Sequence, residues 1–201
     1  MKSKRKILLA AFMLSAVMAS AQKIEGGIMG GVSTGSVKIS EIPNSFTNVI
    51  KGDNIVGIEG GFFMKLNAGP FYGKPELFLN YRSGKVDMEN ETGEATQSTL
   101  FKMSRLEIPL MFGLELFSPV AIELGPVYNR VLNVTETFES DRISIRKGGL
   151  GYRLGAVVEL GRANLSIHYQ GLKLGSSSSY SEATYDSPSE LIFGIGIQLG
   201  K

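Results

Sequence analysis

Charged side chains stand at alternate positions within several otherwise apolar segments, and they are the groups in this chain that could do chemistry. Two carboxyl groups held close together can act as general acid and general base. The only histidine, His168, could be a general base or a pH switch, but no Ser/Asp partners for it can be identified in the sequence. Charges of both signs enclosed together are better explained as ion pairs, because an unpaired buried charge is costly. We therefore expect no catalytic residue, but a polar network that fills an interior. Its members are Glu76, Arg82, Arg105, Glu107, Glu123, Arg153, Glu159 and His168.

The composition argues against several other kinds of site. The 201 residues contain no cysteine, which excludes disulfides, thiolate metal sites, a cysteine nucleophile and a lipoprotein anchor. A single histidine argues against a histidine-based metal centre, and the glycine-rich stretch at 149–154 lacks the last glycine of a dinucleotide fingerprint. We expect neither a metal nor a cofactor. Four of the 21 basic residues lie within residues 1–6, which leaves 17 against 19 acidic residues and argues against nucleic acid as a partner.

The first 21 residues have the three parts of a secretory signal peptide. Basic residues at 2–6 precede an apolar run at 7–18, and Ala19-Ser20-Ala21 forms an A-x-A cleavage site before Gln22. We predict cleavage between Ala21 and Gln22, so that 1–21 is removed and a single domain spans 22–201. A spanning helix needs about 20 apolar residues, and no later stretch reaches that length. A membrane-embedded mature chain would therefore have to be a barrel.

Alternation with a period of two, typical of half-buried strands, dominates the rest of the chain. It predicts eight strands, at 24–33, 55–66, 71–82, 99–116, 120–134, 145–160, 164–174 and 190–199. The connections alternate between long polar segments such as 84–98 and short turns such as 117–119. Outer-membrane barrels combine long external loops with short periplasmic turns, and eight strands return the chain to the side on which it began.

Each predicted strand has one apolar face and one face on which charges mix with glycine. The apolar faces include Leu110, Ile122 and Val158. In a membrane barrel these residues face lipid and the charges line the lumen; in a secreted or periplasmic soluble barrel that binds a small apolar ligand, as in a lipocalin, the orientation is reversed. Glycine on the charged faces favours the membrane barrel, because a narrow eight-stranded lumen must accommodate long side chains. Further charges on these faces are Glu59, Lys65, Lys74, Glu115 and Glu190.

Aromatic residues of the predicted strands fall into two sets. If the long connections are external, the tyrosines lie near the external end of the apolar band and the phenylalanines near its periplasmic end. Two aromatic girdles are expected where an apolar band meets two interfaces. The external set is Tyr81, Tyr128, Tyr152 and Tyr169, and the periplasmic set is Phe62, Phe71, Phe112 and Phe117.

Several short motifs occur in a fixed order along the chain. They are Pro75-Glu76-Leu77, Leu106-Glu107-Ile108-Pro109-Leu110, Gly125-Pro126 and Leu165-Ser166-Ile167-His168-Tyr169. In this order the sequence resembles the PorT-like outer-membrane β-barrel family of Gram-negative bacteria, over essentially the whole mature chain. The resemblance implies an outer-membrane barrel and no shared enzymatic activity. One departure is the carboxyl end, Leu199-Gly200-Lys201, where such barrels commonly have an aromatic residue that the assembly machinery reads.

Together these features predict an all-β protein, an eight-stranded antiparallel up-and-down transmembrane β-barrel of the cell outer membrane. We expect a structural role, or an interaction role through the external loops, and no enzymatic activity. Expected partners are outer-membrane lipid, the barrel-assembly machinery during biogenesis, and a protein or surface ligand at the loops. Eight strands leave no aqueous channel, so a solute pore is not expected. Glu76, Glu107, Arg82 and Arg105 are expected to pair in register across the neighbouring strands at 71–82 and 99–116.

Overall fold

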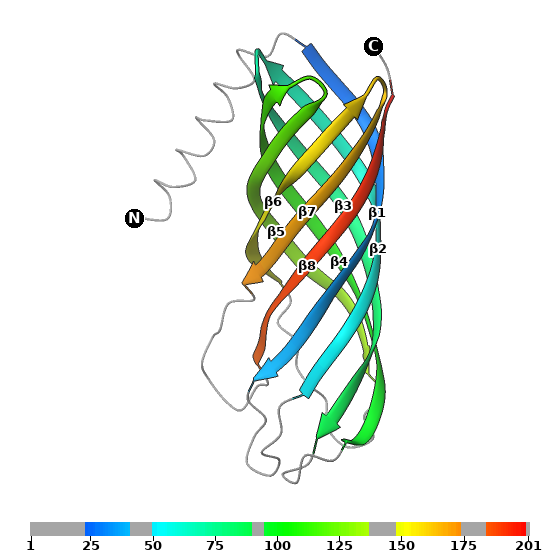
Figure 1. The fold of residues 1–201 in the computed structure, drawn as a ribbon. Helices are drawn as coiled ribbons and strands as arrows, with labels where there is room; N and C mark the ends of the chain where they lie inside the picture. The colour runs from blue at the N-terminus through cyan, green and yellow to red at the C-terminus, as the bar shows by residue number, and fades with distance from the viewer. Residues whose placement is uncertain (1–22, 41–49, 90–94, 137–147, 174–183, 200–201) are drawn as a thin grey trace, which may run out of the picture.

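The computed structural model describes residues 23–40, 50–89, 95–136, 148–173 and 184–199, which form one closed barrel (Figure 1). Each strand pairs antiparallel with its neighbours in sequence, and β1 also pairs with β8, which closes the sheet. The predicted fold class is confirmed. Within the described ranges, no helix is both long and apolar enough to cross a membrane. The strands are β1 (Lys23–Ser40), β2 (Ile50–Ala68), β3 (Phe71–Glu89), β4 (Ala95–Phe117), β5 (Val120–Glu136), β6 (Gly148–Leu160), β7 (Ala163–Lys173) and β8 (Thr184–Gln198).

The short turns all lie at one end of the barrel. They join β2 to β3, β4 to β5 and β6 to β7, and the start of β1 and the end of β8 lie at the same end (Figure 1). Two of these turns contain a glycine in the left-handed region, Gly69 with a φ of 64° and Gly161 with a φ of 68°. A side chain at either position would strain the backbone. We call this the turn end of the barrel and the opposite one the loop end.

All strands except β6 and β7 run further toward the loop end than the alternation predicted, and the predicted ends of these two at 145 and 174 lie outside the described residues. β3 extends to Glu89 and β4 begins at Ala95, so the prediction of a loop over 84–98 is wrong. Backbone pairing continues through this region, where Val86 lies opposite Thr99. The ladder of backbone hydrogen bonds needs no apolar face. Strands can therefore continue into water, where the alternation that marks burial on one face has ended.

The two faces of the barrel wall are oriented as in a membrane barrel. Outward side chains such as Ile122 and Leu124 are 42% and 63% exposed, whereas Glu123 between them is 3% exposed. The same alternation of exposed apolar and buried inward residues runs along β3, β4, β7 and β8. A soluble barrel with an apolar ligand cavity requires the reverse orientation. This arrangement disfavours the lipocalin-like alternative.

Candidate functional site

Inward-facing glycines make room for large side chains inside the barrel. Gly27 on β1 lies opposite Phe63 on β2, and Gly113 on β4 lies opposite Tyr72 on β3. A Cβ atom added at either glycine would collide with the ring opposite it. The lumen of an eight-stranded barrel is only wide enough to be filled by side chains. The glycines therefore decide where the bulky and charged groups of the interior can lie.

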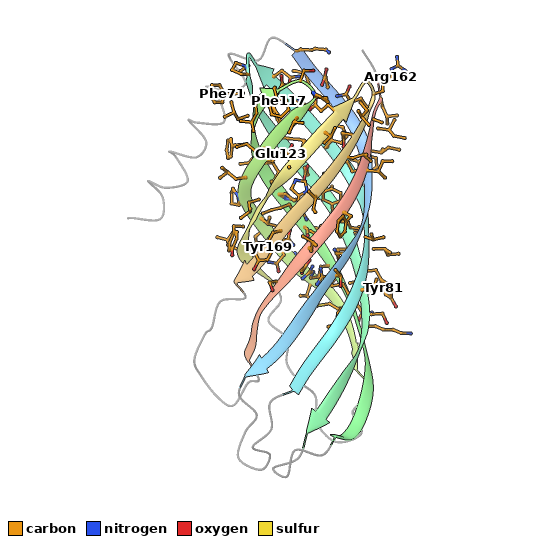
Figure 2. The ribbon with its side chains drawn as sticks, in the orientation of Figure 1. Phe71, Tyr81, Phe117, Glu123, Arg162 and Tyr169 are labelled. Carbon is orange, nitrogen blue, oxygen red and sulfur yellow. The ribbon has the colours of Figure 1, made fainter. Side chains whose placement is uncertain are left out.

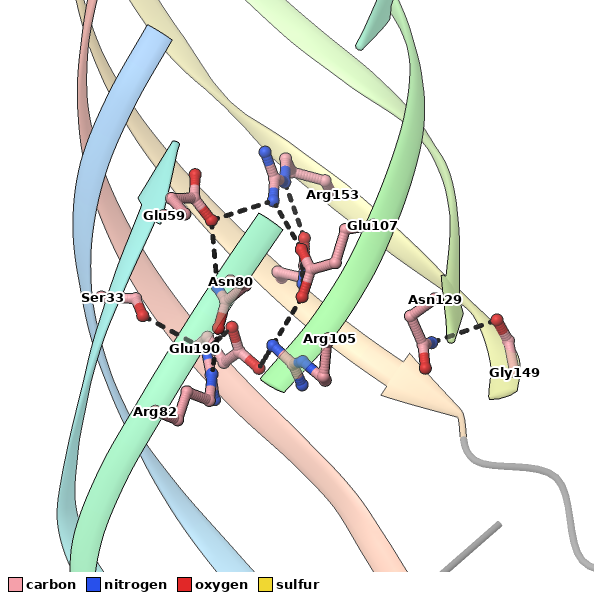
Figure 3. Close-up of polar contacts among 11 residues, drawn as sticks. Ser33, Glu59, Asn80, Arg82, Arg105, Glu107, Asn129, Gly149, Arg153 and Glu190 are labelled. Atoms are coloured by element: carbon pink, nitrogen blue, oxygen red, sulfur yellow. Dashed lines mark hydrogen bonds and ion pairs between the residues drawn. The ribbon is translucent and has the colours of Figure 1, made fainter. Parts of the chain in front are cut away.

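Arg153 on β6 occupies the middle of the charged interior (Figure 3). Its Nη2 atom lies 3.1 Å from Oε2 of Glu107 and 3.6 Å from Oε2 of Glu59. Its Nη1 atom lies 3.5 Å from Oε2 of Glu76. Gln170 accepts a 2.6 Å hydrogen bond from Nε of Arg153 and donates one of 3.1 Å to Glu107. All five side chains are buried, so Arg153 joins carboxylates from β2, β3 and β4 in the absence of bulk water.

A second group of charges lies closer to the loop end and is continuous with the first. Glu190 on β8 forms ion pairs with Arg82 and with Arg105, the latter at 2.9 Å (Figure 3). Arg105 also lies 2.6 Å from Glu107, which in turn contacts Arg153. Charges of opposite sign thus alternate across the lumen from β8 to β6.

Neutral polar side chains complete this region, and sequence analysis did not include them in the network. Asn80 accepts a 3.1 Å hydrogen bond from Nε of Arg82 and donates one of 3.2 Å to Glu59. Ser33 on β1 accepts a 3.3 Å hydrogen bond from Nη2 of Arg82. Asn80 occupies an inward position two residues before Arg82, so the alternation alone could have predicted that its side chain lies in the interior. A search restricted to charged residues missed it.

Glu123 on β5 is the centre of a third group, nearer the turn end (Figure 2). Tyr72 donates a 2.8 Å hydrogen bond to its Oε1 atom, and Nε2 of His168 lies 3.0 Å from its Oε2 atom. Nζ of Lys74 lies 2.5 Å from Glu123 and 3.1 Å from Glu76. Because Glu76 also contacts Arg153, this group is connected to the other two. Sequence analysis missed Tyr72, which lies just beyond the charged part of its strand.

Glu159 lies apart from the other seven predicted network residues. Its Oε1 atom is 2.5 Å from Nζ of Lys65, which also lies 3.3 Å from Glu115 and 4.2 Å from the centre of the Tyr72 ring. The side chains of Glu159 and Glu115 are 30% and 45% exposed. The two carboxylates therefore reach the water-accessible mouth at the turn end, whereas Lys65 between them is buried.

The expected pairing in register across β3 and β4 is wrong. Glu107 lies opposite Phe78, and Arg105 lies opposite Asn80. Arg105 and Glu107 do pair, but as neighbours two residues apart on one strand. The charged groups find most of their partners across the lumen, because closure of the barrel brings distant strands face to face.

The interior also contains an apolar layer. Met29, Phe63 and Phe78 form a buried cluster, and the guanidinium of Arg153 lies 5.4 Å from the centre of the Phe78 ring. Within the described ranges, no group of three or more His, Cys, Asp or Glu side chains is arranged to hold a metal ion. The arrangement pairs and encloses charges, which holds opposite walls of the barrel together.

The predicted aromatic residues all lie on the outer wall and are exposed. Figure 2 shows Phe71 and Phe117 beside the turn end, and Tyr81 and Tyr169 further toward the loop end. The ring centres of Tyr152 and Tyr169 are 6.3 Å apart. Among the remaining girdle residues, Tyr128 lies midway along β5, and Phe62 and Phe112 lie several residues inside β2 and β4. The predicted cleavage site at Ala21 and Gln22 lies outside the described residues.

Solved structures of other proteins have the same fold as this chain. Neither a protein-family model nor a curated protein matches the chain. Neisserial surface protein A (NspA) is 18% identical with a TM-score of 0.51, and the match covers 89% of this chain and 100% of NspA. The outer membrane protein OprG from Pseudomonas aeruginosa is 14% identical with a TM-score of 0.55, and the match covers 92% of this chain and 100% of OprG. By its fold, the chain is a small transmembrane β-barrel similar to these two proteins.

Proposed function

We propose that the protein is a closed barrel of the bacterial outer membrane, with a structural or interaction role that it exerts from its loop end. The observation that carries this proposal is the barrel interior. Arg82, Arg105 and Arg153 are each at most 2% exposed, and all three form ion pairs with buried carboxylates. Because the interior is closed, we expect the protein to act through the surface at its loop end.

An interior filled in this way supports neither solute conduction nor catalysis. A continuous water-filled channel would expose the charges that line it, whereas Glu107 is fully buried. His168, the side chain best suited to general base catalysis, is buried against Glu123. A substrate would have to displace the ion pairs to reach it. We therefore assign no enzymatic activity to the barrel.

We further assign the chain to the PorT-like family on its motifs. Two of these motifs, Pro75-Glu76-Leu77 and the segment at 106–110, contribute Glu76 and Glu107 to the contacts of Arg153. The partners that follow from this assignment are outer-membrane lipid around the apolar wall, the barrel-assembly machinery during biogenesis, and a protein or surface ligand at the loop end.

Cell fractionation tests the location. We expect the protein in the outer-membrane fraction, with a gel mobility that shifts on heating and an amino terminus at Gln22. Release into the soluble periplasm would contradict the membrane assignment.

Recording from planar lipid bilayers tests the closed interior. The folded barrel should show no steady conductance, because charges paired across the lumen leave no continuous path for hydrated ions. A stable, ion-selective current would overturn the assignment of a closed barrel.

A further inference from the structure

The outer wall of the barrel changes character just beyond the tyrosines at the loop end. On β4, Lys102 lies two residues closer to the loops than Ser104, which is opposite Tyr81 on β3. On β5, Arg130 occupies the next outward position after Tyr128. Both cationic side chains are exposed. Toward the loop end, Lys102 thus follows Ser104 on β4 beside Tyr81, and Arg130 follows Tyr128 on β5, with the exposed side chain of Leu132 beyond it.

These two cations differ from those inside the barrel. Each interior lysine and arginine of the described strands forms an ion pair with a glutamate. Among the side chains that the structure describes, none forms an ion pair with Lys102 or with Arg130. Tyrosines favour the boundary between apolar lipid and headgroups. Cations directly beyond them lie at the level of the headgroups, where basic residues attract anionic lipids.

We propose that Lys102 and Arg130 bind the phosphate groups of an anionic lipid in the leaflet at the loop end. Arg130 lies opposite Leu106, four residues along β4 from Lys102, so the two cations are separated by roughly 13 Å along the strand direction at about 3.3 Å per residue. Two long side chains at this spacing match a lipid headgroup that carries two phosphates. Arginine binds phosphate through paired hydrogen bonds, and lysine binds it as a point charge.

Two neutral polar residues lie between the two cations, beside the exposed side chain of Leu132. Ser104 lies opposite Asn133, and both occupy outward positions between Lys102 and the row of Arg130. Hydroxyl and amide groups there can donate hydrogen bonds to phosphate or sugar oxygens. We call Lys102, Ser104, Arg130 and Asn133 the headgroup patch.

The choice of leaflet rests on the proposed function, since it requires the loop end to be external. Binding by the patch can be measured on the purified barrel without reference to its location in the cell. Failure of the headgroup patch and failure of the outer-membrane assignment are therefore separate results.

The test measures retention of lipid A, a glycolipid with two phosphates, by native mass spectrometry of the full barrel in neutral detergent. Lipid A without its phosphates is the matched probe and should be retained far less. Lys102→Gln and Arg130→Gln should each weaken binding about fivefold, and the double variant about 25-fold, as expected for two juxtamembrane cations acting independently. Arg130→Lys should keep part of the affinity.

Arg162→Gln is the matched control, because Arg162 is an exposed cation in a turn at the opposite end of the barrel (Figure 2). It should leave lipid A binding unchanged, and gel mobility before and after heating verifies that every variant is folded. Equal retention of the two lipid probes would overturn the proposal. So would a loss in Arg162→Gln as large as that in Arg130→Gln, or displacement of lipid A by an equal concentration of inorganic phosphate.

Discussion

Replacing Arg153 with methionine removes a cation that three carboxylates share, and the contacts indicate which carboxylate is left alone. Glu107 and Glu76 each keep a second cation within 3.1 Å. Glu59 keeps only an amide hydrogen bond among the described side chains. The variant Arg153→Met therefore strands the charge of Glu59 in the barrel interior.

The cost can be worked out from this geometry. Opposite charges 3.6 Å apart, the separation of Arg153 and Glu59, attract by about 5 kcal/mol at an effective dielectric constant of about 20. Removing one partner of a buried pair typically costs about 3–5 kcal/mol. We expect Arg153→Met to lower the free energy of unfolding by an amount in that range. Adding Glu59→Gln should restore about 1–2 kcal/mol, because it removes the stranded charge. Adding Glu76→Gln instead should restore less.

Reversible urea unfolding from lipid vesicles measures these differences, with the folded fraction read from gel mobility before and after heating. Arg162→Met makes the same substitution at an exposed turn position and should change the free energy of unfolding by at most about 0.5 kcal/mol. The reasoning is refuted if Arg153→Met costs no more than Arg162→Met, or if Glu59→Gln restores no stability.

Three further predictions concern the pairing of charges, the glycines and the lipid face. Arg105→Met and Glu107→Gln, combined in a double-mutant cycle, should show a coupling of about 2 kcal/mol, since the charges pair at 2.6 Å in the interior; purely additive effects would contradict the pairing. Gly27→Val should impair refolding into vesicles because an aromatic ring occupies the space of its side chain, whereas Gly30→Val on the outward face of the same strand should refold normally. Equal refolding yields would show that the inward glycine is dispensable. Ile122→Arg should lower the free energy of unfolding by about 2–4 kcal/mol in the same titration, and an unchanged value would mean that this face meets water.

Strand number, pairing order and the orientation of the wall could all be predicted from the sequence. These properties depend on local patterns: alternation marks a strand with two different faces, and short turns make neighbouring strands antiparallel. Ile122 and Glu123 illustrate this. They are adjacent in the chain, and the apolar residue faces outward while the charged residue is buried inside, so the residue type alone was enough to assign each to a face.

The partners of the interior charges could not be predicted in this way. Glu190 was correctly assigned to an inward face, but its partners Arg82 and Arg105 lie on β3 and β4. The stagger between all the strands of the closed barrel decides which side chains meet across its lumen. This stagger cannot be determined from any short segment of the sequence. The outer ends of the strands were missed for a related reason, since pairing in water leaves no alternation to detect.

The contacts of Arg82 have a consequence for the order of assembly. From β3, this side chain reaches Ser33 on the first strand and Glu190 on the last, the two strands whose pairing closes the cylinder. A sheet that is open between the first and last strands cannot bring Arg82 to Glu190, and a charge without its partner is costly in lipid. A folding intermediate must therefore keep its charged face hydrated until the first and last strands meet. We expect ring closure and dehydration of the lumen to occur in a single cooperative step, so that a barrel without its last strand lacks a stable inserted form.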